Sequence, residues 1–281
     1  YSWGRNHSGQ LGIGNTSNQN YATKVLGING NGYIDNVVDI DSAASYTIAL
    51  KSDGTVCMWG DNSSMQLGNG TTTTSNVPII SNLEEKMIQV TVSHSWAASS
   101  GLTQHGRVWS WGNSYYYSLG NEVSSNSGTA PVLMKATNIV EISRGDCWIC
   151  LKDLDGNVYS VGFNCNGQIL NGGTSNQSTL YKITLPSTVN ENNKVRYINA
   201  NSYINRILLQ DGTIWTGGLN YSGEVSNGSQ GATCTSYVQA KNSDGSYITD
   251  AKTLGRTEYH NTDGHIMYIN ENGYIYTVGC N

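Results

Sequence analysis

The sequence predicts an all-β protein built from repeated antiparallel sheets. Three observations lead to this fold class. Residues that suit strands and tight turns are abundant, with 33 Gly, 18 Tyr and 7 Trp among 281 residues. A motif that contains tryptophan and glycine returns along the chain every 50–61 residues. Short runs in which apolar and polar side chains alternate precede the motif, and such a period of two is typical of half-buried strands.

The motif is clearest in its first two copies. Trp3-Gly4-Arg5-Asn6-His7-Ser8-Gly9-Gln10-Leu11-Gly12 returns as Trp59-Gly60-Asp61-Asn62-Ser63-Ser64-Met65-Gln66-Leu67-Gly68. Later copies keep the spacing and lose some of the Trp, Gln or Gly positions. The motif glycines are Gly4, Gly60, Gly112, Gly162, Gly218 and Gly279. We therefore expect five recognisable repeats, at approximately residues 1–56, 57–108, 109–158, 159–214 and 215–275, and a partial sixth at 276–281.

Each repeat predicts the same order of elements. In the clearest case a strand over 37–40 comes first, a second over 47–50 follows, and the pair Asp53-Gly54 then makes a tight turn. Asp-Gly pairs suit such turns because they tolerate positive φ angles. A third strand over 55–59 leads into the motif. Each unit is thus a sheet of three or four antiparallel strands, and no helical periodicity interrupts it.

All-β units of this length are typical of blades that stack radially into a propeller. The full pattern, W-G-x-N-x-x-G-Q-L-G after D-G-x-V-x-x and a V-x-x-I strand, closely resembles the regulator of chromosome condensation repeat family. The resemblance implies a single β-propeller domain over residues 1–281. Members of that family typically have seven blades. The five repeats and the stub therefore indicate a segment cut from a longer ring, and a ring of six with borrowed strands is the alternative.

Composition excludes several classes of protein. The net charge is −5 and only 12% of residues are charged. An acidic balance argues against nucleic-acid binding, which depends on Lys and Arg at phosphates. No apolar stretch approaches the roughly 18 residues of a membrane-spanning helix, so no membrane insertion is expected. The surface rich in Asn, Ser, Thr and Tyr indicates an extracellular or cell-surface protein, and within the family it resembles a bacterial extracellular-type member.

Signatures of catalysis are absent from the sequence. It contains no H-E-x-x-H, G-x-S-x-G or paired-carboxylate motif. Cys147 and Cys150 have CxxC spacing, but they lie at a junction between a loop and a strand rather than before a helix. The other four Cys residues are scattered singly. We expect no enzyme, no cofactor and no metal; the thiols are structural or form disulfides, with Cys147 and Cys165 as the candidate pair.

The order of strands brings both variable loops of every blade to one face of the propeller. Those loops hold Tyr, Trp, Arg and His, whereas the turns at the opposite face hold Asp, Gly and Thr. Aromatic and Arg side chains carry most of the binding energy in protein interfaces. The predicted contact residues for a partner are Tyr46, Trp96, Tyr116, Trp148, Tyr203, Arg206 and Tyr259.

The sequence therefore predicts a non-enzymatic binding scaffold that recognises a protein partner through aromatic loops on one face. The family resemblance implies the same kind of role. Two alternatives stay open: a lectin-like module that binds a glycan at one site per blade, and a structural blade array within a larger surface or phage protein. Trp3, Trp59 and Trp111 recur at one strand position, so we expect them to pack between blades.

Overall fold

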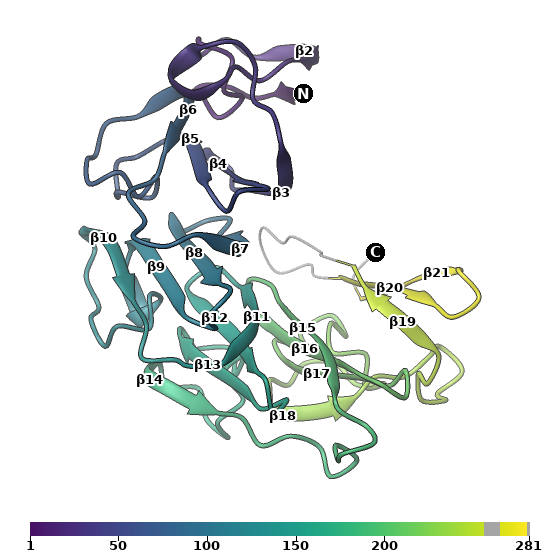
Figure 1. Cartoon of the computed structure of the whole chain (residues 1–281). Helices are drawn as coiled ribbons and strands as arrows, with labels where there is room; N and C mark the ends of the chain where they lie inside the picture. Colours follow the sequence, from purple (N-terminus) through teal and green to yellow (C-terminus); the bar gives the residue numbers. More distant parts are fainter. Residues whose placement is uncertain (256–264, 280–281) are drawn as a thin grey trace. The chain divides into compact units, whose positions relative to one another are not determined.

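The computed structural model describes residues 1–255 and 265–279, and in these ranges every regular element is a strand or a single 3-10 turn. The strands form six antiparallel sheets (Figure 1). The first contains β1 (Ser2–Gly4) and β2 (Gln19–Thr23), and the last contains β19 (Ala251–Leu254), β20 (His265–Asn270) and β21 (Ile275–Gly279).

The four sheets between them have four strands each, in chain order across the sheet. They are β3 (Val37–Ser42), β4 (Tyr46–Lys51), β5 (Val56–Gly60) and β6 (Ser75–Ile80); β7 (Met87–Val92), β8 (Ala98–Thr103), β9 (Val108–Asn113) and β10 (Gly128–Leu133); β11 (Ile139–Arg144), β12 (Trp148–Asp153), β13 (Val158–Gly162) and β14 (Gln177–Lys182); β15 (Val195–Ala200), β16 (Ile204–Leu209), β17 (Ile214–Gly218) and β18 (Cys234–Gln239). The predicted sheets of three or four strands are confirmed.

The predicted Asp-Gly turns join the second and third strands of the sheets. Gly54 has a φ of +79°, and its N–H donates to the carbonyl of Lys51 at 2.9 Å. Only glycine adopts such a φ without strain, which explains the residue at this position. The turn sets the register, in which Tyr46 lies opposite Gly60 and Leu50 lies opposite Val56.

The asparagine of the motif holds the loop after the third strand. The amide of Asn62 donates to the carbonyls of Thr71 at 2.8 Å and Thr73 at 3.1 Å, and its Oδ1 accepts from the N–H of Leu67 at 2.9 Å. Asn6, Asn164 and Asn220 make the equivalent bonds in their own loops. Each side chain is fully buried, so the motif asparagine replaces water at backbone groups that the loop would otherwise leave unpaired.

Residue contacts divide the chain into two units, Tyr1–Ile142 and Ser143–Asn281. The first unit holds an apolar cluster between its second and third sheets, with Ile48, Leu50, Val90 and Trp111. The second unit holds a cluster with Trp148, Ile198 and Ile207 and a smaller one around Tyr268. The expectation of one domain over 1–281 stays a prediction.

Two of the three recurring tryptophans pack as predicted. The indole N–H of Trp59 donates to the carbonyl of Gln10 at 2.8 Å, and that of Trp111 donates to the carbonyl of Gln66 at 2.9 Å. Each ring lies against a glycine of the preceding motif, where a Cβ would collide with it. The prediction for Trp3 is wrong: its side chain is 64% exposed, because no glycine loop of the described residues covers it.

Candidate functional site

Three of the seven predicted contact residues are buried and cannot touch a partner directly. Tyr46 and Trp148 are the first residues of β4 and β12, and Arg206 lies in the middle of β16. All three side chains are at most 1% exposed. The prediction placed them on loops, and it is wrong because the strands begin earlier than expected and turn these side chains between the sheets.

Each buried side chain has a structural role. The hydroxyl of Tyr46 lies within hydrogen-bond distance of the carbonyls of Ser93 and Ala98, in the next sheet. The indole of Trp148 donates to the carbonyl of Asn201 at 3.0 Å. The guanidinium of Arg206 donates to Asn199 at 3.2 Å, and burial lowers the pKa of Arg206 to about 9, so the group still carries its charge at neutral pH.

The remaining predicted residues fall into separate places. Trp96 and Tyr116 lie together in the first unit, and Tyr203 lies in the second unit beside Phe163, with ring centroids 6.4 Å apart. Tyr259 lies outside the described residues. Trp96 and Tyr116 are thus the pair of predicted contact residues that the structure brings together.

These two residues form an aromatic patch with Tyr115, which we call the Trp96 patch. Trp96 stacks on Tyr115 with centroids 5.7 Å apart and an interplanar angle of 23°. Tyr116 meets Trp96 edge-on at 6.2 Å and lies 4.0 Å from Tyr115. Trp96 is 41% exposed, and both tyrosines are partly exposed. Tyr115 was not among the predicted contacts. The run Tyr115-Tyr116-Tyr117 in the motif loop is the sequence feature that could have indicated an aromatic cluster there.

Backbone geometry presents the patch from two loops. Trp96 lies between β7 and β8, where its N–H donates to Ser93 Oγ at 3.2 Å. The tyrosines form the single turn after β9, where the N–H of Tyr115 donates to Asn113 Oδ1 at 2.8 Å. Tyr116 has a φ of +56°, in the left-handed region that costs free energy for a non-glycine residue. The loop therefore holds the rings in place by side-chain bonds rather than by regular structure.

The described residues offer little for catalysis or metal binding. Among them no group of three His, Cys, Asp or Glu side chains is placed to hold a metal ion. In the part of the chain that the structure describes, no helix is long and apolar enough to span a membrane. The Trp96 patch itself consists of neutral rings.

The predicted disulfide between Cys147 and Cys165 is wrong, because both thiols are free. The two loops do meet through backbone, where the N–H of Phe163 donates to the carbonyl of Cys147 at 2.9 Å. The side chain of Cys147 is buried, whereas that of Cys165 is exposed. Burial raises the pKa of Cys147 well above its usual value, so this thiol stays protonated at neutral pH.

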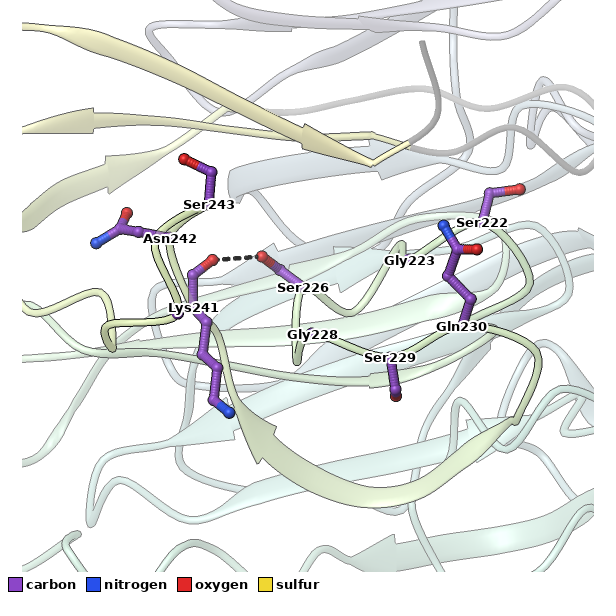
Figure 2. A pocket seen from close by; sticks show the side chains of 10 residues that line it. Ser222, Gly223, Ser226, Gly228, Ser229, Gln230, Lys241, Asn242 and Ser243 are labelled. Atoms are coloured by element: carbon purple, nitrogen blue, oxygen red, sulfur yellow. Dashed lines mark hydrogen bonds between the residues drawn. The ribbon is translucent and has the colours of Figure 1, made fainter.

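The second unit also contains a polar hollow of about 540 Å³ (Figure 2). Its lining includes Ser226, whose hydroxyl donates to the carbonyl of Lys241 at 2.8 Å. Ser222, Gln230 and Asn242 lie around it. Glycines and hydroxyl side chains make up most of the remaining lining, so the hollow lacks the aromatic surface of the Trp96 patch. No sequence pattern had singled it out.

A repeated glycan site has no support in the described residues. The lectin alternative requires equivalent aromatic positions in every blade. The residues at the start of each second strand, Tyr46, Ala98, Trp148 and Ile204, are all buried, and the exposed loop aromatics differ from blade to blade.

The N-terminal part of the chain matches a known repeat family. A model of the "Regulator of chromosome condensation (RCC1) repeat" matches residues 1–50 and 53–98. E3 ubiquitin-protein ligase HERC2 of Mus musculus is 28% identical over 179 residues, which are 62% of this chain and 4% of that protein. The chain therefore spans a small part of this curated relative.

Solved structures with the same fold are less similar in sequence. Human WBSCR16 superposes with a TM-score of 0.71 at 16% identity, over 86% of this chain and 64% of that one. Prp20p from Saccharomyces cerevisiae, characterised for its binding to Gsp1p and histones, superposes with a TM-score of 0.61 at 16% identity, over 99% and 80% of the two chains.

Proposed function

We propose that the chain is a non-catalytic scaffold of the RCC1 repeat type that binds a protein partner through the Trp96 patch. The support is the RCC1 repeat model that matches residues 1–50 and 53–98, the fold shared with Prp20p, and the exposed aromatic rings. The observation that carries the proposal is a neutral, partly exposed cluster of three aromatic rings held by two loops. Exposed Trp and Tyr side chains that bury on contact are the commonest anchors of protein interfaces.

The comparisons support the class of partner. Prp20p, which shares the fold, binds Gsp1p and histones. The partner proposed for this chain is likewise a protein, but the proposal does not extend to Gsp1p or histones. We assign no catalytic step to the chain. The raised pKa of the buried Cys147 makes this thiol a poor nucleophile, because a thiol reacts only when it is ionised.

The experiment compares two aromatic truncations in the first unit. A partner captured from the native host is titrated against wild-type chain, Trp96→Ala and Tyr21→Ala, where Tyr21 is exposed on β2 and outside the patch. We expect Trp96→Ala to weaken binding by about 2 kcal/mol, or roughly 30-fold, and Tyr21→Ala to leave it unchanged. Equal affinities for all three proteins would remove the Trp96 patch from the interface.

We also propose that the protein acts outside the cell or at its surface. The support is compositional: only 12% of residues are charged, and Asn, Ser, Thr and Tyr dominate the loops. Immunoblotting of surface, secreted and cytosolic fractions of the native host tests the location. Recovery of the protein with the cytosolic marker alone would contradict it.

A further inference from the structure

Three of the motif asparagines belong to N-x-S sequences, the acceptor pattern for N-linked glycans. The sequences are Asn6-His7-Ser8, Asn62-Ser63-Ser64 and Asn220-Tyr221-Ser222. An oligosaccharyltransferase joins the side-chain nitrogen of such an asparagine to a sugar. The bond between C1 of the sugar and its lipid pyrophosphate carrier breaks, the bond between Nδ2 and C1 forms, and the amide loses one proton. What this step does to the protein depends on how the folded chain holds the asparagine.

The folded loops leave no room for a sugar on these three nitrogens. Asn6 and Asn62 are 0% exposed, and Asn220 is 1% exposed. Nδ2 of Asn6 donates to the carbonyls of Asn15 at 2.9 Å and Ser17 at 3.0 Å, so each of its two protons has its own acceptor. A glycan would replace one of those protons and leave one carbonyl without its donor. The closed loop and the glycan therefore exclude each other.

Folding closes these loops too late to hide the asparagines from the transferase. The next sheet covers the motif loop: the indole of Trp59 donates to the carbonyl of Gln10, 49 residues away, and that of Trp111 donates to Gln66, 45 residues away. Synthesis proceeds at about 5–20 residues per second, so a motif waits roughly 2–10 s for that sheet. The transferase acts on the extended chain as it enters the lumen of the secretory pathway. A chain made there would meet the enzyme with its motif asparagines exposed.

The serines of the three acceptor sequences are replaceable. Each uses its backbone N–H to donate, at 2.7–2.9 Å, to the side chain two residues further on; the pairs are Ser8 and Gln10, Ser64 and Gln66, and Ser222 and Glu224. Asn166 stands at the equivalent position of another copy and makes the same bond to Gln168 at 3.1 Å. One substitution per copy would remove the acceptor sequence at little structural cost, yet three acceptor sequences are present. They are harmless only in a chain that never meets the transferase.

We propose that this protein folds in a compartment without N-glycosylation and reaches its place of action without passing an oligosaccharyltransferase. The burial and the hydrogen bonds of Asn6, Asn62 and Asn220 support this route. The route is independent of the partner that the Trp96 patch binds. A protein that acts outside the cell would then arrive there by an export route that lacks the transferase.

Two further acceptor sequences lie at the surface and report on the route. Asn15-Thr16-Ser17 is exposed, and Asn69-Gly70-Thr71 is exposed apart from its half-buried asparagine. In the part of the chain that the structure describes, the side chains of Asn15 and Asn69 are held through Oδ1, and no hydrogen bond uses their Nδ2. We expect mass spectrometry of the protein from its native host to find both unmodified. A glycan on either would show passage through the transferase and overturn the proposal.

Forced secretion tests the physical reason. The chain is expressed in a eukaryotic cell line in two forms, one in the cytosol and one behind a cleavable signal peptide. We expect the cytosolic form to fold. The secretory form is expected to stay inside the cell and to lose mass on endoglycosidase treatment, with Asn6, Asn62 and Asn220 among the occupied sites in peptide mass spectra.

The matched control removes the three buried acceptor sequences and keeps every asparagine. The triple variant Ser8→Ala, Ser64→Ala and Ser222→Ala retains the backbone N–H bonds of those positions. It is expected to be secreted in a folded form that carries glycans at surface sites alone. Ser17→Ala removes one surface acceptor sequence by the same kind of change, and it is expected to be retained in the cell like the wild-type chain.

Three outcomes of forced secretion would also overturn the proposal. Folded, secreted wild-type chain with a glycan on Asn6, Asn62 or Asn220 would show that the loops admit a sugar. Folded, secreted wild-type chain with these three unmodified would show that folding outruns the transferase. Retention of the triple alanine variant, when it folds in the cytosol like the wild-type chain, would show that retention has a cause other than the buried acceptor sequences.

Discussion

Asn62 shows why the motif keeps asparagine in a loop. Its side chain satisfies two carbonyls and one N–H of the loop from a fully buried position. Alanine would leave these backbone groups unpaired, and each such group costs about 1–3 kcal/mol. We expect Asn62→Ala to lower the free energy of unfolding in urea by roughly 3 kcal/mol.

The matched control for that change is Asn82→Ala. Asn82 is exposed and donates one side-chain bond, to the carbonyl of Asn69 at 2.9 Å. Water replaces this partner after truncation, so we expect a change of less than about 0.5 kcal/mol. Equal midpoint shifts for the two variants would show that burial of the motif asparagine adds nothing to stability.

Trp59 and Trp148 are both buried packing residues. Sequence reasoning placed Trp59 in the core and Trp148 on a binding loop. Both are buried, and each donates to a loop carbonyl outside its own sheet, Trp59 to Gln10 and Trp148 to Asn201. We expect Trp59→Ala and Trp148→Ala each to cost about 3–5 kcal/mol in urea unfolding. A stable, folded Trp148→Ala variant with a wild-type midpoint would contradict the burial of this ring.

Burial also makes the thiols of Cys147 and Cys165 differ in reactivity. We expect Cys165, which is exposed, to react with a thiol reagent in the native protein, and Cys147 to react only after unfolding because its raised pKa leaves little thiolate at neutral pH. Cys165→Ser is expected to remove one equivalent from the fast phase, and Cys147→Ser to leave that phase unchanged. A fast phase that loses an equivalent in Cys147→Ser would show that this thiol is accessible.

At the scale of the strand and turn, two equivalent turns in the second unit separate backbone strain from steric contact. Gly156 and Gly212 have φ angles of +85° and +80°. A Cβ at Gly156 meets nothing within 4 Å, whereas one at Gly212 lies 2.6 Å from the carbonyl oxygen of Thr249. Alanine costs about 1 kcal/mol at either glycine from its φ.

The contact adds to that cost at Gly212 alone. We expect Gly212→Ala to be more destabilising than Gly156→Ala by about 1–3 kcal/mol, measured by urea unfolding. A larger loss for Gly156→Ala would show that the turn between β16 and β17 relaxes away from the sheet that follows it.

At the scale of the whole molecule, we expect a far-UV circular dichroism spectrum dominated by β structure. The described residues contain strands and two single 3-10 turns, Ile28–Gly30 and Tyr115–Tyr117. A helix content above about a fifth would contradict the fold class, because it exceeds what strands and turns produce.

Local features of the sequence were sufficient for the repeated sheets. The Asp-Gly turns, the alternation of apolar residues and the spacing of the motif glycines each depend on residues close together in the chain, so they predicted the strands, their order and the fold class. The packing of Trp59 and Trp111 also followed, because their repeat neighbours recur in the sequence.

Burial between sheets was decided only by the tertiary structure. Tyr46, Trp148 and Arg206 belong to short segments that contain loop-like residues, and no local pattern tells which side of a sheet meets another sheet. The same holds for Trp3, Val37 and Ile40, whose repeat equivalents are buried although they themselves are exposed. The geometry of a turn is set by residues close by in the sequence. The exposure of a strand's side chains is set by the sheet that packs against it, and contacts of this kind join residues more than 50 positions apart.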